Sequence, residues 1–201
     1  MQTSFTDAQL QDPGTARANE ILRACVHCGF CTATCPTYKV LGDELDSPRG
    51  RIYLMKDMLE NSRVPDPKTV KHIDRCLSCL ACMTTCPSGV HYMHLVDHAR
   101  TYVEANYKRP LMDRLLRWTL ARILPYPMRF RAALAGAKLA KPFARLIPDA
   151  RLRAMLAMAP KTIPPVSRND DAQVFPATGP RKARVALMTG CAQKALNTDI
   201  N

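Results

Sequence analysis

Two cysteine runs with identical spacing constrain the fold of this 201-residue chain more than any other feature. Each run has the form C-x-x-C-x-x-C-x-x-x-C-P, and together they hold eight of the nine cysteines. The runs consist of Cys25, Cys28, Cys31 and Cys35, followed by Pro36, and of Cys76, Cys79, Cys82 and Cys86, followed by Pro87. Two loops with thiols at such fixed intervals are expected to fold around whatever those thiols bind.

This spacing is the ligand pattern of bacterial [4Fe–4S] ferredoxins. Three cysteines at intervals of three residues can wrap one loop around three iron corners, and the fourth thiolate must come from elsewhere. In two-cluster ferredoxins the fourth cysteine of each run ligates the other cluster. We therefore predict two [4Fe–4S] clusters, the first held by Cys25, Cys28, Cys31 and Cys86 and the second by Cys76, Cys79, Cys82 and Cys35.

Residues beside the cysteines support a close approach of the backbone to a metal. Pro36 and Pro87 lack a backbone N–H and disfavour helical backbone at the preceding residue, so the chain is expected to turn away there. Gly29 in the first run allows the backbone to come near a cluster. The second run has Leu80 at that position, so this feature is not strictly repeated.

A structural zinc site and a disulfide framework are the alternatives for these cysteines. Structural zinc sites use separated pairs of ligands, which match a triple C-x-x-C-x-x-C poorly. Disulfides form in oxidising compartments, whereas residues 1–15 contain no apolar signal peptide. We therefore expect a cytoplasmic iron–sulfur protein. A metal-binding module with a structural or sensing role is the alternative from another class.

The positive charge is concentrated in the middle of the chain. The formal net charge is +12 at pH 7. Residues 1–107 hold 11 Lys and Arg against 12 Asp and Glu, whereas residues 108–161 hold 13 against 2. Arginines mixed with leucines in amphipathic helices are typical of docking on acidic partners or anionic membrane surfaces. We expect a protein partner, with a peripheral membrane contact or a solvated face as alternatives, and no nucleic acid.

Two dipeptides predict helix starts between the cysteine runs. Ser47-Pro48 and Asp66-Pro67 each combine an N-cap residue with a proline at the first helical position. After Ser47 an apolar stripe with helical spacing continues to near Asn61. The connection between the runs is therefore expected to be helical.

Helices are also expected on either side of the cysteine runs. Residues 1–14 are polar and are expected to be frayed, and a helix then begins near Thr15. Ser88 can cap a further helix after the second run. The apolar face of that helix consists of Met93, Val96, Ala99 and Val103. Since no alternating strand pattern occurs in residues 15–107, we predict a mainly α fold with a helical two-cluster ferredoxin domain over residues 1–107.

The rest of the chain divides into three predicted parts. Residues 108–159 predict a basic helical segment, and residues 160–180 predict a proline-rich linker. The apolar run at residues 183–188 predicts a buried strand at the start of a domain over residues 181–201. Residues 197–199 predict the beginning of a further helix. Because one strand cannot bury a core, we expect this to be the start of a truncated α/β domain.

Three stretches carry a resemblance to a known family. Residues 21–38 and 41–53, together with Gly190-Cys191-Ala192-Gln193, resemble the iron–sulfur subunit of bacterial glycolate oxidase (glycolate dehydrogenase). The cysteine pattern alone does not separate this subunit from iron–sulfur subunits of anaerobic glycerol-3-phosphate dehydrogenase, lactate-utilisation proteins or heterodisulfide reductase. A related dehydrogenase is therefore the alternative.

The resemblance implies an electron-transfer subunit. In this family it carries electrons from an FAD-containing subunit, which oxidises glycolate to glyoxylate, towards a quinone-type acceptor. It also implies association with the inner membrane through the complex. Family members continue into cysteine-rich repeats with C-C-G motifs, and Cys191 matches the start of the first. The chain has no G-x-G-x-x-G motif, so substrate chemistry is expected on another polypeptide.

Three other side chains are candidates for a role near the metal. Arg49 and Arg51 lie in the first turn of a predicted helix and could offset the negative charge of a cluster. His27 lies inside the first run and is expected beside the cluster or at the surface, not as a ligand. A separate group has helical spacing and is expected to form a partly exposed helix face: His91, His94 and His98. Cys191 lies outside the two runs and is expected to be a free thiol.

Overall fold

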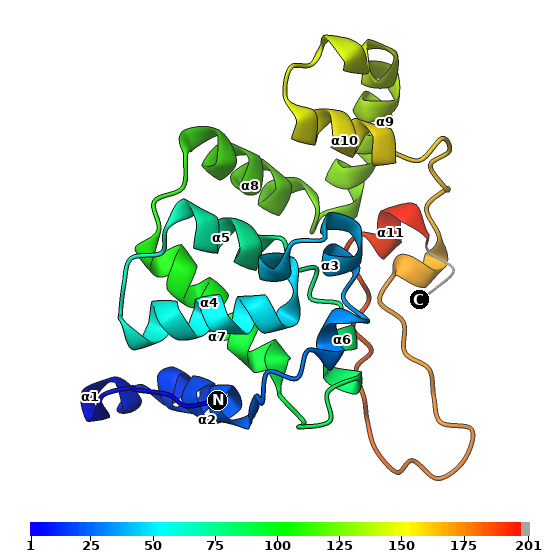
Figure 1. Cartoon of the computed structure of the whole chain (residues 1–201). Coiled ribbons are helices and arrows are strands. Elements are labelled where there is room, and N and C mark those ends of the chain that lie inside the picture. The colour runs from blue at the N-terminus through cyan, green and yellow to red at the C-terminus, as the bar shows by residue number, and fades with distance from the viewer. Residues whose placement is uncertain (198–201) are drawn as a thin grey trace. The chain divides into compact units, whose positions relative to one another are not determined.

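The computed structural model describes residues 1–197 and is helical, with no β-strand among those residues (Figure 1). The chain divides into two compact units, Met1–Lys108 and a second unit that begins at Arg109. Both cysteine runs lie in the first unit. The prediction of a mainly α fold is confirmed.

The first unit contains seven α-helices and two short 3-10 helices. They are α1 (Asp7–Leu10), α2 (Pro13–Ala24), η1 (Phe30–Thr32), α3 (Pro36–Leu41), η2 (Glu44–Asp46), α4 (Pro48–Glu60), α5 (Pro67–Asp74), α6 (Ala81–Thr84) and α7 (Tyr92–Asn106). The Ser47 side chain accepts from the N–H of Gly50 at the start of α4, and Asp66 accepts from the N–H of Thr69 at the start of α5. Both predicted helix starts are therefore confirmed.

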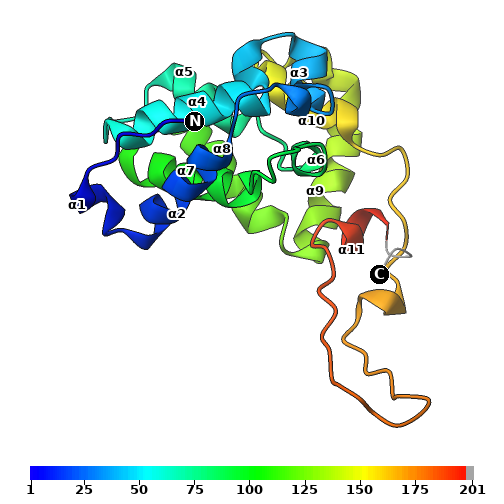
Figure 2. The ribbon, with the colours of Figure 1, turned by 60° about the horizontal axis from the view of Figure 1, so that its bottom comes forward.

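The core of the first unit lies where α2, α4 and α5 pack against α7 (Figures 1 and 2). The residues with no exposed surface at this centre are Leu22, Met55, Met58, Ile73, Leu95 and Ala99. Helix α2 ends one residue before Cys25, and α5 ends two residues before Cys76. Each cysteine run thus begins at the end of a helix that the core holds in place.

Two local expectations for the first unit are wrong. The N-terminal residues are ordered, because Thr6 and Gln9 form a capping box around α1 and the Gln9 amide donates to the carbonyls of Leu59 and Glu60. Ser88 does not cap α7. That helix begins at Tyr92, which is buried, and its N-cap is His91, without a side-chain hydrogen bond.

The second unit has a thin core. Its helices are α8 (Leu111–Ile123), α9 (Pro127–Ala140), η3 (Lys141–Leu146), α10 (Ala150–Met158), η4 (Arg168–Asp170) and α11 (Gln193–Leu196). Among its described residues three apolar side chains are buried: Leu134, Ala159 and Ala195. None of the helices in the described part of the chain has the length and apolarity needed to cross a membrane.

The buried strand expected at residues 183–188 is not formed. Val185, Leu187 and Met188 are exposed, and the backbone there is irregular. A strand needs a neighbour to receive its N–H and C=O groups, and no described segment supplies one. The helix start expected at residues 197–199 lies largely outside the described residues.

Candidate metal centre

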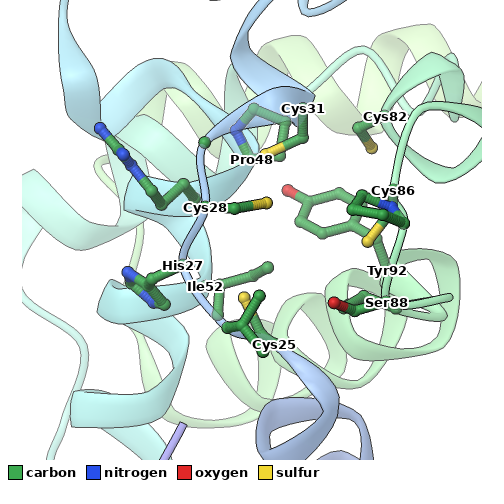
Figure 3. Close-up of a pocket in the computed structure, with 15 residues that line it drawn as sticks. Cys25, His27, Cys28, Cys31, Pro48, Ile52, Cys82, Cys86, Ser88 and Tyr92 are labelled. Carbon is green, nitrogen blue, oxygen red and sulfur yellow. The ribbon is translucent and has the colours of Figure 1, made fainter.

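Thiols from both cysteine runs converge on a first hollow of about 440 Å³, which is partly open to solvent. Cys25, Cys28 and Cys31 line it from the first run, and Cys82 and Cys86 line it from the second. Figure 3 shows the sulfur atoms facing the space between the two loops. These cysteines of the two runs, which are at least 51 positions apart in the sequence, therefore lie around the same space.

A second hollow, of about 310 Å³, has the complementary set of thiols. Cys76, Cys79 and Cys82 line it from the second run, and Cys35 lines it from the first. Cys82 and Tyr92 line both hollows, so the hollows adjoin. Each hollow is therefore lined by the four cysteines that the sequence predicts as one ligand set. Cys82, from the second set, also lines the first hollow.

The two cysteine loops share an unusual backbone conformation. His27 and Gly29 have φ angles of 56° and 85°, and the matched positions of the second run, Ser78 and Leu80, have 51° and 58°. Left-handed residues alternating with ordinary ones turn successive N–H groups towards one side, which makes an anion-binding concavity of the kind found at Fe–S sites. For residues other than glycine this backbone costs about 1–3 kcal/mol.

The thiols lie in surroundings that oppose a free negative charge. Burial, and then the neighbouring thiolates of Cys31 and Cys76, raises the pKa of Cys82 to about 12. Burial also raises the pKa of Cys31. Thiolates there need a cation to offset their charge, and metal binding releases the protons they otherwise hold. Several soft thiolates around an anion-binding backbone fit an iron–sulfur cluster.

Arg51 is a buried cationic side chain beside these thiols, with 1% of its surface exposed. Its Nη1 lies 3.9 Å from Cys35 Sγ, and its Nη2 lies 3.3 Å from Asp46 Oδ1. Its Nε donates to the carbonyl of His72 at 2.6 Å. The guanidinium is therefore held from three sides, with one nitrogen directed at the sulfur of Cys35.

Asp46 joins Arg51 to two further groups. Its carboxylate lies 2.8 Å from Arg75 Nη1 and 2.9 Å from His72 Nδ1. Burial raises the pKa of Asp46, but hydrogen bonds from His72 and Arg75 outweigh it and hold the pKa below its usual value. Asp43, Asp46 and His72 come close enough to hold a cation, yet the Asp46 carboxylate is already engaged by two guanidinium groups. We assign this cluster to an ion-pair network.

Arg49 and His27 lie beside the first hollow in a different setting. Arg49 Nε is 2.7 Å from Glu44 Oε1, and both side chains are more than one third exposed. Figure 3 shows the His27 ring on the far side of the loop from the Cys28 sulfur, and it packs edge-on against Tyr53 with ring centroids 6.4 Å apart. Burial, and then the charge of Arg49, lowers the pKa of His27.

Several residues near the thiols were not found from the sequence. Tyr92 Oη lies 3.7 Å from Cys76 Sγ. Arg100 donates to the Cys76 carbonyl and to Ser78 Oγ, each at 2.6 Å. No motif marks these residues or the Asp46 network, because helices α5 and α7 bring them to the loops from a distance in sequence.

The remaining singled-out residues lie apart from the two hollows. The ring centroids of His91 and His94 are 6.4 Å apart and tilted, whereas His98 packs against Gly14. The three histidines thus do not converge on one point. Cys191 is exposed in the second unit.

Comparison with known proteins agrees with the geometry of the first unit. The family model "4Fe-4S dicluster domain" matches residues 21–90. The glycolate oxidase iron-sulfur subunit of Escherichia coli (strain K12) is 47% identical over the whole chain, and the probable glycolate oxidase iron-sulfur subunit of Bacillus subtilis (strain 168) is 35% identical over 95% of it. The chain spans about half the length of these relatives, with 46% of each covered.

A more distant relative shares the iron–sulfur description. The succinate dehydrogenase iron-sulfur subunit of Coxiella burnetii (strain RSA 493 / Nine Mile phase I) is 25% identical over 46% of the chain and 42% of that protein. No solved structure matches the chain. Residues 21–90 therefore match a 4Fe-4S dicluster domain, in a chain that is similar to the iron–sulfur subunits of glycolate oxidase along at least 95% of its length.

Proposed function

We propose that this chain is an electron-transfer part of a glycolate oxidase iron–sulfur subunit and binds two [4Fe–4S] clusters. It would take electrons from an FAD-containing subunit that oxidises glycolate to glyoxylate and pass them towards a quinone-type acceptor. Substrate chemistry would occur on the partner. Similarity to two relatives of that name over at least 95% of the chain supports this assignment.

The pair of adjoining hollows carries the proposal. We name the thiols of Cys25, Cys28, Cys31 and Cys86 the first site and those of Cys76, Cys79, Cys82 and Cys35 the second site. Crossed ligation ties the two loops together, so neither site can form without the other loop. Each cluster, when bound, supplies a centre that takes up and releases one electron.

The residues around the sites prepare them for this task. The loop N–H groups and the buried guanidinium of Arg51 offset negative charge, and the apolar wall of Ile52 and Tyr92 excludes water. Tyr92 and Cys82 line both hollows, which keeps the sites in direct contact. A short separation favours electron exchange between them.

The surface beside the loops suits contact with a partner. Val26, Phe30 and Leu77 are exposed next to cysteines of the two runs. Apolar side chains around a redox site allow a partner protein to approach closely and exclude water. The basic second unit, with most of the positive charge, would favour an acidic subunit and a peripheral position at the cytoplasmic face of the inner membrane.

Metal analysis tests the two-cluster proposal. The chain is purified without oxygen, and iron and acid-labile sulfide are measured with a visible and EPR spectrum before and after dithionite. We expect about eight irons and eight sulfides, as two [4Fe–4S] clusters require, and absorbance that bleaches on reduction. Zinc in place of iron, or clusters that do not cycle between oxidation states, would favour a structural or sensing module.

Three serine variants test the ligands. Cys28→Ser and Cys79→Ser are each expected to lose or alter one cluster, whereas Cys191→Ser is the matched control outside both runs. Unchanged iron content and EPR spectra in the first two variants would overturn the ligand assignment. To identify the electron donor, the chain is mixed with glycolate oxidase flavin subunits. Bleaching with glycolate, but not with lactate or glycerol 3-phosphate, would support the substrate.

A further inference from the structure

The two sites have unequal charge around them. We propose that the second site has the higher reduction potential, because the Arg51–Asp46–Arg75 network has a net positive charge and directs the buried Arg51 guanidinium at a cysteine of that site. This inference rests on the proposed function, since it concerns clusters at both sites. It predicts that the first electron added to the chain resides at the second site.

The network beside the second site has more positive than negative charge. The single carboxylate of Asp46 faces two guanidinium groups, at 3.3 Å from Arg51 and 2.8 Å from Arg75. The three groups together therefore carry one net positive charge. Asp43 lies 4.0 Å from His72 Nε2. The Asp43 and Arg75 side chains are 46% and 40% exposed, so water screens both charges, whereas Arg51 and Asp46 are buried.

The Arg51 guanidinium is close to the thiols and shielded from water. Asp46 is fully buried, and Arg51, with 1% exposed, directs Nη1 to Cys35 Sγ at 3.9 Å. A charge acts more strongly where the effective dielectric constant is low. Reduction adds negative charge to a site, so a fixed positive charge there favours the reduced state.

A hydrogen-bond donor reaches another sulfur atom of the second site. The Tyr92 hydroxyl donates to Cys76 Sγ at 3.7 Å. Hydrogen bonds to cluster sulfurs are known to tune the potential. Arg100 adds a further cation at the carbonyl of Cys76.

The first site has a weaker positive influence. Arg49 lines its hollow, but its charge is balanced by Glu44 at 2.7 Å. Both side chains are exposed enough for water and salt to screen them, at 35% and 43%. Cys31 also receives a backbone hydrogen bond from Arg49, which carries no net charge. The difference between the sites is thus one of buried charge.

A redox titration of the anaerobically loaded full chain tests this inference. Dithionite is added stepwise, and each reduced cluster is followed by EPR. The wild-type chain should show two separate reduction steps. Cys79→Ser should alter the EPR signal of the step at higher potential, and Cys28→Ser the signal of the step at lower potential. The reverse assignment, or one shared potential, would overturn the inference.

Charge variants separate the network from other causes. Arg75→Gln removes one charge from a side chain that is 40% exposed, so folding is expected to survive, and the upper step should shift towards the lower. Arg51→Lys should retain more of the separation than Arg51→Gln. Arg49→Gln is the matched control and should leave the upper step in place. An upper step that moves with Arg49→Gln and not with Arg75→Gln would overturn the proposal.

Measurement of the metal content distinguishes failure of this inference from failure of the proposed function. A wild-type chain with the expected iron and sulfide but no difference in potential contradicts only the inference. A chain that cannot be loaded with iron contradicts the proposed function itself. Circular dichroism of each variant, compared with the wild-type spectrum, shows whether a changed potential comes with a retained helical fold.

Discussion

Gly29 and Leu80 occupy matched positions in the two cysteine loops and adopt the same left-handed backbone, with φ angles of 85° and 58°. The loops therefore repeat in conformation although the residue differs. Glycine enters this region without a steric penalty, whereas leucine is held there by its surroundings. The second loop therefore has backbone strain at this position, and the first loop does not.

Exchange of these residues should change stability in opposite directions. Gly29→Ala is expected to cost about 1–2 kcal/mol, because an L-residue in this region is strained and its Cβ would meet the Arg49 guanidinium. Leu80→Gly should relieve strain but lose about 0.5–1 kcal/mol to chain entropy, for a small net gain. Anaerobic thermal unfolding measures both. Equal losses in the two variants would contradict the argument.

Gly50 lies in α4 where this helix packs against η2, and a residue with a side chain does not fit there. A Cβ at this position would overlap the backbone carbonyl of Glu44. Because backbone cannot swing aside as a flexible side chain does, Gly50→Ala is expected to cost about 1–3 kcal/mol. Urea unfolding measures the loss. Gly136→Ala is the control: its Cβ meets nothing within 4 Å in α9, so a gain of about 0.5–1 kcal/mol is expected.

Asp46 is expected to be essential for folding of the first unit. Asp46→Asn leaves the buried Arg51 without its counter-charge, and breaking a buried pair in this way costs about 3–5 kcal/mol. Thermal unfolding followed by circular dichroism measures it. Asp43→Asn changes a neighbouring exposed carboxylate and should stay within about 0.5 kcal/mol of wild type. If the two variants lose stability equally, the buried network is not what stabilises this region.

Asp66 links the stability of α5 to pH. The hydrogen bond from the N–H of Thr69 has the largest effect on Asp66 and lowers its pKa below the ordinary value of 3.8. The Arg63 guanidinium lowers this pKa by a smaller amount. A depressed pKa contributes stability above the unfolded value, and this contribution is lost as pH falls through the folded value. Asp66→Ala should cost about 1 kcal/mol at neutral pH through loss of the cap.

Asp66→Asn distinguishes the charge of the cap from its hydrogen bond. Asparagine can still accept from Thr69, so stability at neutral pH should change less than in Asp66→Ala. The decline in stability below about pH 4 should be shallower than in wild type, because the titrating group is gone. Urea unfolding from pH 7 to pH 3 measures both. An unchanged acid decline would show that Asp66 does not contribute to it.

Local patterns in the sequence determined much of the first unit. The cysteine spacing predicted the metal chemistry, and the N-cap and proline pairs at Ser47 and Asp66 predicted where α4 and α5 begin. The two helix starts could be predicted because an N-cap hydrogen bond joins residues only three apart. Neighbouring residues in the sequence are therefore sufficient to form it. The resemblance of residues 21–38 and 41–53 to glycolate oxidase iron–sulfur subunits likewise rests on contiguous residues, and the comparisons agree with it.

Tertiary structure decided what depends on contacts between distant segments. The Asp46 carboxylate meets Arg75 across 29 positions, and the Tyr92 hydroxyl meets Cys76 only because α7 packs in the core. Leu80 adopts a left-handed backbone conformation that favours glycine, because the rest of the fold holds both ends of its loop in place. The predicted strand at residues 183–188 is not formed for the complementary reason. A run of apolar residues is consistent with a buried strand, but the backbone N–H and C=O groups of a strand need a second strand beside them.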